Sequence, residues 1–242
     1  MPAIVKETIL EILKQGEISL QGEFVWGSNY TFFVQVEKGQ ENLRAVYKPT
    51  RGERPLWDFP KSSLARREVA AYLLSEALGW ELVPPTIYRR KAPLGPGSVQ
   101  QFIEHNAEYH YFSFNASDRQ RLRPVVLFDV MINNADRKGG HILLDADNHV
   151  WLIDHGICFH QEDKLRTVVW DFAGEPIPPE LIADLINFQK LFHPTSELIT
   201  ALQKYISPGE ITALEVRTSQ LIESGHFPEP DAQRRPYPWP PI

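Results

Sequence analysis

The chain has 242 residues, and 25 Lys and Arg against 31 Asp and Glu give it a formal net charge of −6. This negative balance disfavours a general nucleic-acid coat, and a hydrophobic content of 43% supports a buried core and argues against disorder of the whole chain. Cys158 is the only cysteine, which excludes a disulfide framework and a multi-cysteine zinc site and favours a cytoplasmic location.

The N-terminal residues predict a short amphipathic helix. Ile4, Ile9, Ile12 and Leu13 recur on one side of such a helix. Charged residues interrupt the stretch, which lacks a basic region and a cleavage site, so we expect no signal peptide. No stretch approaches the roughly 18 consecutive apolar residues that a membrane-spanning helix needs. The sequence therefore predicts no transmembrane segment and leaves peripheral membrane contact open.

Residues 18–104 predict an α+β unit. Segments with a period of two predict a meander of antiparallel strands at 18–26, 31–36 and 43–48. Ser62 and Ser63 can cap a helix that runs from Leu64 to about Leu78 and ends at Gly79. Two further strands are expected at 82–89 and 97–104.

The second half of the chain predicts a mostly helical unit. A continuous helix is expected from Ala116 to Asn133, followed by a hairpin whose strands, 142–144 and 150–153, flank a polar turn. Three more helices are expected at 180–192, 196–206 and 209–224. The final residues, PYPWPPI, predict an extended tail without a core of its own.

Four charged residues stand where the local pattern favours other residue types. Lys48 ends an apolar strand, and Glu68 lies on a largely apolar helix face, where a carboxylate calls for a buried cation. Asp136 follows an apolar helix, and Asp154 ends an apolar strand. Phosphoryl transfer uses these residue types in this order: a strand lysine on the phosphates, a helix glutamate, an aspartate at the acceptor and an aspartate on the metal.

The segment from Asn134 to Leu144, followed by Ile153-Asp154-His155-Gly156, resembles the catalytic and metal-binding loops of the phosphatidylinositol 3- and 4-kinase superfamily, especially the type II 4-kinases. The chain is similar to a small bacterial member of that group. The resemblance implies a two-lobed, protein-kinase-like α+β fold, with an antiparallel sheet and helix in the N-lobe and a mostly helical C-lobe. The expected boundaries are 1–104 for the N-lobe, 105–227 for the C-lobe and 228–242 for a Pro-rich tail.

The resemblance also implies a nucleotide site. A turn containing glycine and serine would cover the phosphates, a strand lysine paired with a helix glutamate would hold them, and adenine would stack against the hinge at 100–104. The positions that match the nucleotide-binding residues are Ser28, Asn29, Lys48, Glu68, Gln101 and Phe102.

The catalytic and metal positions follow in the same way. Asp136 matches the catalytic aspartate, with Arg137 beside it, and Asp154 matches the metal-binding aspartate. The superfamily usually has an asparagine on the metal where this chain has His141. Because imidazole suits Mn²⁺ better than Mg²⁺ and has an ordinary pKa of about 6.5, we expect a Mn²⁺ preference and an activity that falls in acid.

These features predict a kinase that uses ATP with Mg²⁺ or Mn²⁺ to phosphorylate a hydroxyl group on a lipid, a small molecule or a protein. The alternative is a pseudokinase, a nucleotide-binding or protein-interaction module in which His141 marks lost catalysis. The negative net charge argues against an anionic membrane, so a lipid acceptor is no better supported than the others. The Pro-rich tail could instead engage a protein partner.

Other site types fit the sequence less well. The histidines near Cys158 match no standard zinc spacing, and Asp145, Asp147 and Asn148 lack the glycine and glutamate of a calcium loop. We therefore expect a hairpin turn there.

Overall fold

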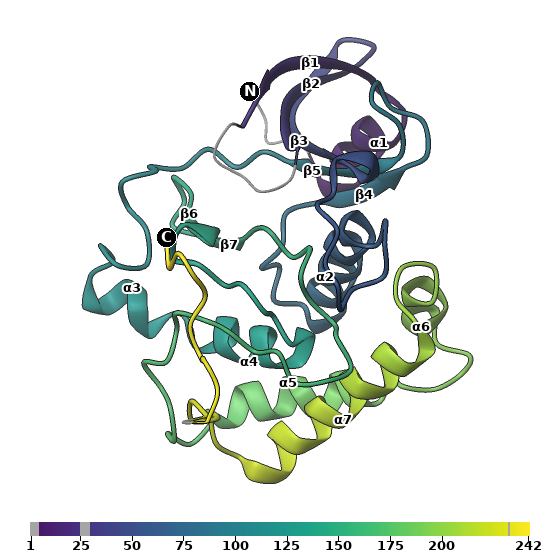
Figure 1. Cartoon of the computed structure of the whole chain (residues 1–242). Helices are drawn as coiled ribbons and strands as arrows, with labels where there is room; N and C mark the ends of the chain where they lie inside the picture. The colour runs from purple at the N-terminus through teal and green to yellow at the C-terminus, as the bar shows by residue number, and fades with distance from the viewer. Residues whose placement is uncertain (1–4, 25–29, 232) are drawn as a thin grey trace.

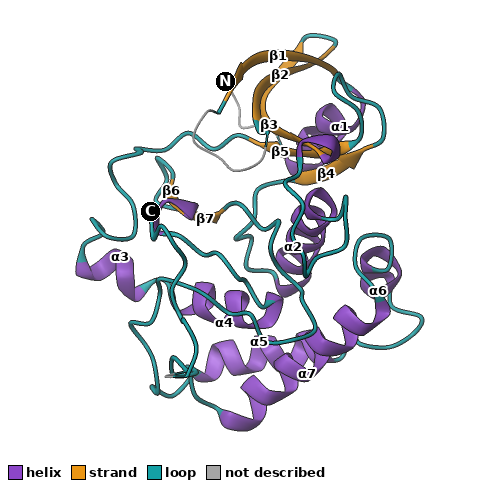
Figure 2. Ribbon diagram, viewed as in Figure 1, coloured by secondary structure: helices purple, strands orange, loops and turns teal. Residues whose placement is uncertain are grey.

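The structure is a computed structural model that describes residues 5–24, 30–231 and 233–242. It has two lobes, with an antiparallel sheet in one and most of the helices in the other (Figure 1). Figure 2 shows the strands gathered at one end of the molecule and the helices α4, α5 and α7 at the other. The α+β, protein-kinase-like fold class predicted from the sequence is confirmed.

The N-lobe is built on a five-stranded antiparallel sheet with the order β1-β2-β3-β5-β4. The strands β1, β2 and β3 pair in chain order, as the predicted meander requires, and β5 lies between β3 and β4. The strand bounds are Glu17–Glu23, Phe32–Lys38, Glu41–Pro49, Thr86–Arg89 and Gly97–Gln101, for β1 to β5 in turn.

Helix α1, Lys6–Gln15, covers one face of this sheet (Figure 1). Its apolar side chains Ile12 and Leu13 are buried against Ala45 and Tyr47 of β3 in a small core of their own. Because side chains alternate along a strand, Lys48 points to the opposite face of the sheet, toward the C-lobe.

Helix α2, Leu64–Leu78, has the predicted bounds and ends at Gly79 in the left-handed conformation. Ser63 occupies the N-cap position, as predicted, but its side chain makes no cap hydrogen bond to the helix. The Glu53 carboxylate accepts from the free backbone N–H groups of Leu64 and Ala65 instead, at 3.2 and 2.9 Å. A negative group at this end also suits the helix dipole.

The C-lobe differs from the prediction at its first helix. The continuous helix expected from Ala116 to Asn133 is two helices, α3 at Ala116–Gln120 and α4 at Arg123–Ile132. Pro124 lies in the first turn of α4, where a missing N–H costs nothing, and it cannot continue a helix that precedes it. The remaining helices are α5, α6 and α7 at Pro179–Gln189, Glu197–Leu202 and Pro208–Ser224.

The predicted hairpin is present as β6, Ile142–Leu144, and β7, Val150–Leu152. Short 3-10 turns occupy Thr50–Gly52 and Gly139–His141. The C-lobe core extends into α2, because the buried residues of that helix, among them Leu74 and Leu78, belong to the same apolar cluster as α4, α5 and α7.

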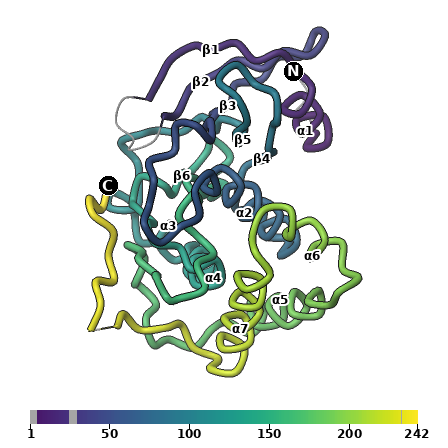
Figure 3. Tube along the Cα trace, turned by 45° about the vertical axis from the view of Figure 1, so that its right-hand side comes forward, coloured from purple at the N-terminus to yellow at the C-terminus, as the bar shows by residue number. Residues whose placement is uncertain are grey.

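The C-terminal residues pack against the C-lobe and form no helix or strand of their own within the described residues. Figure 3 shows this segment running along the lobe from α7 toward β6. Pro238 is buried, and the Pro236 and Pro241 carbonyls accept hydrogen bonds from the C-lobe. Within the described residues, no helix is long and apolar enough to cross a membrane.

Candidate active site

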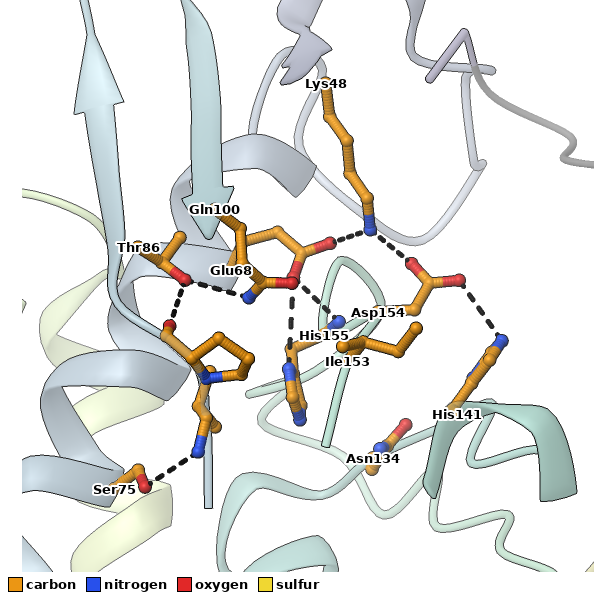
Figure 4. A network of polar contacts seen from close by, with 12 residues as sticks. Lys48, Glu68, Ser75, Thr86, Gln100, Asn134, His141, Ile153, Asp154 and His155 are labelled. Carbon is orange, nitrogen blue, oxygen red and sulfur yellow. Dashed lines mark hydrogen bonds and ion pairs between the residues drawn. The ribbon is translucent and has the colours of Figure 1, made fainter. Parts of the chain in front are cut away.

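The side chain of Lys48 joins the two lobes. Its Nζ lies 2.5 Å from Glu68 Oε1 on α2 and 2.8 Å from Asp154 Oδ1, which follows β7 (Figure 4). Burial of the ammonium opposes its charge, but Asp154 and Glu68 outweigh this effect and raise the pKa of Lys48 above its ordinary value. Three residues widely separated in sequence therefore meet as one charged group between the two lobes, and this place between Lys48, Glu68 and Asp154 is called the cleft below.

The Asp154 carboxylate is ionised and half exposed, with 48% of the side chain accessible. The nearby Lys48 ammonium, acting against burial, holds the pKa of Asp154 well below its usual range. The backbone of Asp154 has a φ of 62°, in the left-handed region that few residues other than glycine adopt. Such backbone conformations gather at functional sites, where surrounding contacts sustain them.

Glu68 is nearly inaccessible, and both of its carboxylate oxygens are used. Oε1 accepts from Lys48, and Oε2 accepts from the backbone N–H of His155 at 2.9 Å. The carboxylate thereby ties the lysine to the loop that carries Asp154. These contacts give α2 a fixed relation to the end of β7.

Asp136 lies in the loop after α4 and is partly exposed. Its backbone N–H donates to Asn134 Oδ1 at 3.0 Å, and its carboxylate lies 3.2 Å from Lys138 Nζ. Burial raises the pKa of Asp136, and the negative charge of Asp154 adds to this rise while Lys138 opposes it. Lys138 is a neighbour that the sequence analysis missed.

Arg137 points away from the cleft. Its guanidinium is fully buried, pairs with Asp129 of α4 at 3.0 Å and donates to the carbonyl of Ile153 at 2.9 Å. It also contacts His155 Nε2 at 2.8 Å. The guanidinium therefore holds α4 against the Asp154 loop and does not face the cleft. An aspartate within an otherwise apolar helix was the available sequence signal for this pair.

His141 faces Asp154, with Nε2 3.5 Å from Oδ2 (Figure 4). Burial, aided by nearby Arg137 and Lys138, lowers its pKa to about 4. With its pKa lowered in this way the imidazole would be neutral between pH 6 and 8, so the loss of activity in acid that an ordinary histidine pKa predicts is expected at lower pH. A neutral imidazole can act as a ligand.

Asp154 and His141 can hold a divalent cation only if further ligands complete its coordination. No group of three or more His, Cys, Asp and Glu residues suited to a metal occurs among the described residues. Asp154 and His141 offer one carboxylate and one imidazole, and Mg²⁺ or Mn²⁺ in nucleotide sites is commonly held by one or two protein ligands together with phosphate oxygens. The donor set suits a cation that arrives with a nucleotide.

The expected hinge follows β5. The backbone N–H groups of Gln101 and Phe102 donate to the carbonyls of Pro85 and Arg44, and both side chains are partly exposed. The Phe102 ring packs edge-on against Phe33, with the ring centroids 5.1 Å apart. The amide of Gln100 is turned away, toward the Thr86 hydroxyl at 2.8 Å. The predicted phosphate-covering positions Ser28 and Asn29 lie outside the described residues.

Comparison with known proteins identifies the family. Residues 62–205 match the family described as phosphatidylinositol 3- and 4-kinase. Protein Rv2133c of Mycobacterium tuberculosis is 38% identical over 95% of this chain and 94% of its own length. The chain belongs to the phosphatidylinositol 3- and 4-kinase family. This match includes α2, the Asp136 loop and Asp154, whereas Lys48 precedes it.

Other relatives of this family member are plant kinases. Phosphatidylinositol 4-kinase gamma 4 of rice, Oryza sativa subsp. japonica, is 29% identical over 65% of this chain. That alignment covers 34% of the rice protein, so the chain spans about a third of its length.

Solved structures share the fold of this family member. The Golgi casein kinase with Mn/ADP bound has a TM-score of 0.56, with 16% identity, and the match covers 98% of this chain and 80% of that one. The proinflammatory kinase CtkA of Helicobacter pylori has a TM-score of 0.52, with 10% identity, and covers 89% and 94%. At these identities the likeness establishes the kinase-like fold.

Proposed function

We propose that this family member is an ATP-dependent phosphotransferase that moves the γ-phosphoryl group to an alcohol. The observation that carries the proposal is the bridge made by Lys48 between Glu68 and Asp154, which brings a phosphate-binding cation and a metal-binding carboxylate together across the cleft. A kinase-like structural neighbour with Mn/ADP bound supports ATP and a divalent cation as cofactors.

Each charged residue then has a chemical task. Lys48 would contact the nucleotide phosphates, while Glu68 keeps it extended. Asp154, with His141, would hold a divalent cation, which supplies positive charge to the phosphoryl oxygens. Asp136 would accept a hydrogen bond from the acceptor hydroxyl and orient it. Orientation matters because phosphoryl transfer passes through a loose transition state, and enzymes accelerate it mainly by positioning the reactants and neutralising charge.

The acceptor is a lipid, a small molecule or a protein. The names of the plant relatives make phosphatidylinositol the first acceptor to test. Vesicles with and without phosphatidylinositol, at equal anionic charge, would separate acceptor recognition from attraction to a negative surface. Phosphorylation confined to the phosphatidylinositol vesicles supports a lipid acceptor, whereas none in either case directs the search to soluble alcohols and proteins.

A pseudokinase is the second candidate, and His141 favours it. In the neutral ring, Nδ1 can accept from the Lys138 backbone N–H at 3.5 Å, which leaves Nε2 protonated and directed at Asp154. A protonated Nε2 cannot bind a cation, so catalysis with metal would require the other tautomer.

Thermal unfolding with ATP and Mn²⁺ or Mg²⁺ tests nucleotide binding, and release of ADP with phosphatidylinositol vesicles and a panel of soluble alcohols and proteins as acceptors tests turnover. ATP together with the cation should raise the unfolding temperature, and Asp154→Ala should abolish the cation-dependent part. Asp147→Ala is the matched control, because this exposed aspartate lies in the hairpin turn that leads to the same loop.

The outcomes separate the two candidates. Cation-dependent stabilisation with ADP release supports the phosphotransferase, and stabilisation without ADP release supports the pseudokinase. If millimolar ATP leaves the unfolding temperature of the wild-type chain unchanged with either cation, the nucleotide site itself is wrong.

A further inference from the structure

The last residues of the chain contact the loop that carries Asp136 and His141. The backbone N–H of Gly139 donates to the carbonyl of Pro241 at 2.8 Å. Gly139 begins the short 3-10 turn that ends at His141. The chain terminus is therefore hydrogen-bonded to the turn that positions the imidazole beside Asp154.

Gly139 has no room for a side chain. A Cβ atom built on it would lie 2.7 Å from the ring of Phe112, and 3.6 Å from the Pro241 carbonyl oxygen. The carbonyl of Gly139 also accepts from the backbone N–H of Tyr111, at 3.4 Å. The start of this turn is thus held between the ring of Phe112 and the C-terminal segment.

A second contact holds the other side of the same loop. The backbone of Arg137 forms a parallel bridge with Thr167, supported by a bond from Val168 N–H to the Arg137 carbonyl at 3.1 Å. The Pro236 carbonyl accepts from the Thr167 N–H at 3.0 Å, and from the Trp170 indole N–H at 3.4 Å. The carbonyls of Pro236 and Pro241 therefore bind the backbone at Thr167 and at Gly139.

The composition of the segment suits this task. The segment contains four prolines, at positions 236, 238, 240 and 241. A proline has no backbone N–H, so its backbone can only accept hydrogen bonds. Its fixed φ angle also lowers the conformational entropy that the segment loses when it becomes ordered. Pro238, between the two fastening points, is buried. A half-open cavity of about 660 Å³ lies between the segment and the C-lobe, with walls that include Tyr111, Phe112, Trp170, Tyr237 and Trp239.

We propose that residues 236–242 are an intramolecular strap that fixes the loop 136–141, directly at Gly139 and indirectly through Thr167, which bridges to Arg137, and that phosphoryl transfer requires the strap while nucleotide binding by Lys48 does not. The part of the proposal that concerns transfer rests on the proposed function. The part that concerns the loop does not, because it can be measured without turnover.

The first test uses the full chain with Pro238→Asp, which places a charge where the strap is buried. Pro230→Asp is the matched control, because it makes the same substitution at an exposed proline outside the strap. Hydrogen exchange of the amides of 137–141 and 166–170 should accelerate by about tenfold or more in the first variant and remain unchanged in the control. Faster proteolysis between Arg235 and Ile242 would show that the strap is displaced in Pro238→Asp. If hydrogen exchange at 137–141 and 166–170 is nevertheless unchanged in that variant, the proposal is overturned.

The second test removes residues 236–242 and adds them back as a synthetic peptide. The truncated chain should bind ATP with the cation as the full chain does, while its ADP release falls by about tenfold. The peptide should restore both turnover and slow hydrogen exchange, and a scrambled peptide should restore neither. Faster turnover after truncation, with inhibition by the peptide, would instead show a lid over the acceptor side and overturn the strap. Absence of ADP release from the full chain counts against the proposed function, and the exchange data then decide the strap alone.

Discussion

Two groups of charged side chains lie next to each other and differ in what surrounds them. The cleft group is Lys48, Glu68, Asp136 and Asp154. The sealed group is the ion pair of Asp129 and Arg137, with the buried imidazole of His155 beside it. In the cleft group the side chains of Lys48 and Asp154 are 22% and 48% exposed, whereas those of Arg137 and Asp129 are 0% and 1% exposed.

The sequence does not separate the two groups, because Asp136 of the cleft group and Arg137 of the sealed group are adjacent residues. Asp136 is partly exposed beside Lys138, whereas Arg137 is buried in the C-lobe. His155 links the groups, because its backbone N–H donates to Glu68 and its ring contacts Arg137. Lys48 and Asp154 keep access to solvent and can meet a substrate, whereas the nearly inaccessible Glu68 resembles the sealed group and holds other residues in place.

The largest expected effect separates the groups by activity. Asp136→Asn removes the charge that orients the acceptor, and we expect turnover to fall by about 10²–10⁴-fold. Stabilisation by ATP and the cation should remain, because the nucleotide contacts are elsewhere. The measurement is ADP release beside thermal unfolding, with Asp147→Asn as the control. Retention of more than a tenth of the turnover would place acceptor orientation on another residue.

The same substitution in the sealed group should act on stability. Asp129→Asn leaves the guanidinium of Arg137 buried without a compensating charge, which we expect to cost about 3–5 kcal/mol of unfolding free energy. Denaturant unfolding measures this loss. A double variant, Asp129→Asn with Arg137→Met, should recover part of it, because it removes the unpaired charge. An unfolding free energy equal to that of the unaltered chain would show that water or a rearranged partner reaches the guanidinium.

His141→Asn tests the boundary between the groups. An amide oxygen suits Mg²⁺ better than an imidazole does, so the ratio of turnover with Mn²⁺ to turnover with Mg²⁺ should fall by about tenfold. Rates with each cation at saturating ATP provide the ratio. A ratio that does not change removes His141 from the metal site and leaves it as a hydrogen-bond partner of Asp154.

The smallest expected effect concerns the helix that supplies Glu68. Glu53→Gln keeps one acceptor oxygen but loses the negative charge at the start of α2, so unfolding free energy should fall by about 0.5–1 kcal/mol. Glu23→Gln is a control, because Glu23 is an exposed glutamate of β1. Equal losses in the two variants would deny the cap a specific role.

Local pattern was sufficient for much of the fold. The bounds of α2, the strand meander and the hairpin follow from residue periodicity and from Gly79, because these are short-range effects. Pro124 was a local signal too, and the predicted continuous helix overlooked it.

The remaining differences depend on partners distant in sequence. Nothing near Leu64 indicates that Glu53 caps the helix, and nothing near Arg137 indicates which way its side chain turns. Lys48, Glu68 and Asp154 were placed together through a family resemblance, since periodicity alone gives each residue a face and no partner. The seat of the C-terminal prolines follows from contacts with Gly139 and Thr167 that composition does not encode.

The position of α2 has a mechanical consequence. Its apolar side chains belong to the C-lobe core, while α1 and the sheet keep a separate core. A rigid-body displacement of one lobe would therefore divide the molecule between the sheet with α1 on one side and α2 on the other, along a boundary crossed by the ion pairs Lys48–Glu68 and Lys6–Glu76. The lengths of these two ion pairs would report how far the lobes have separated, and a spectroscopic probe on β3 paired with one on α2 would follow the motion directly.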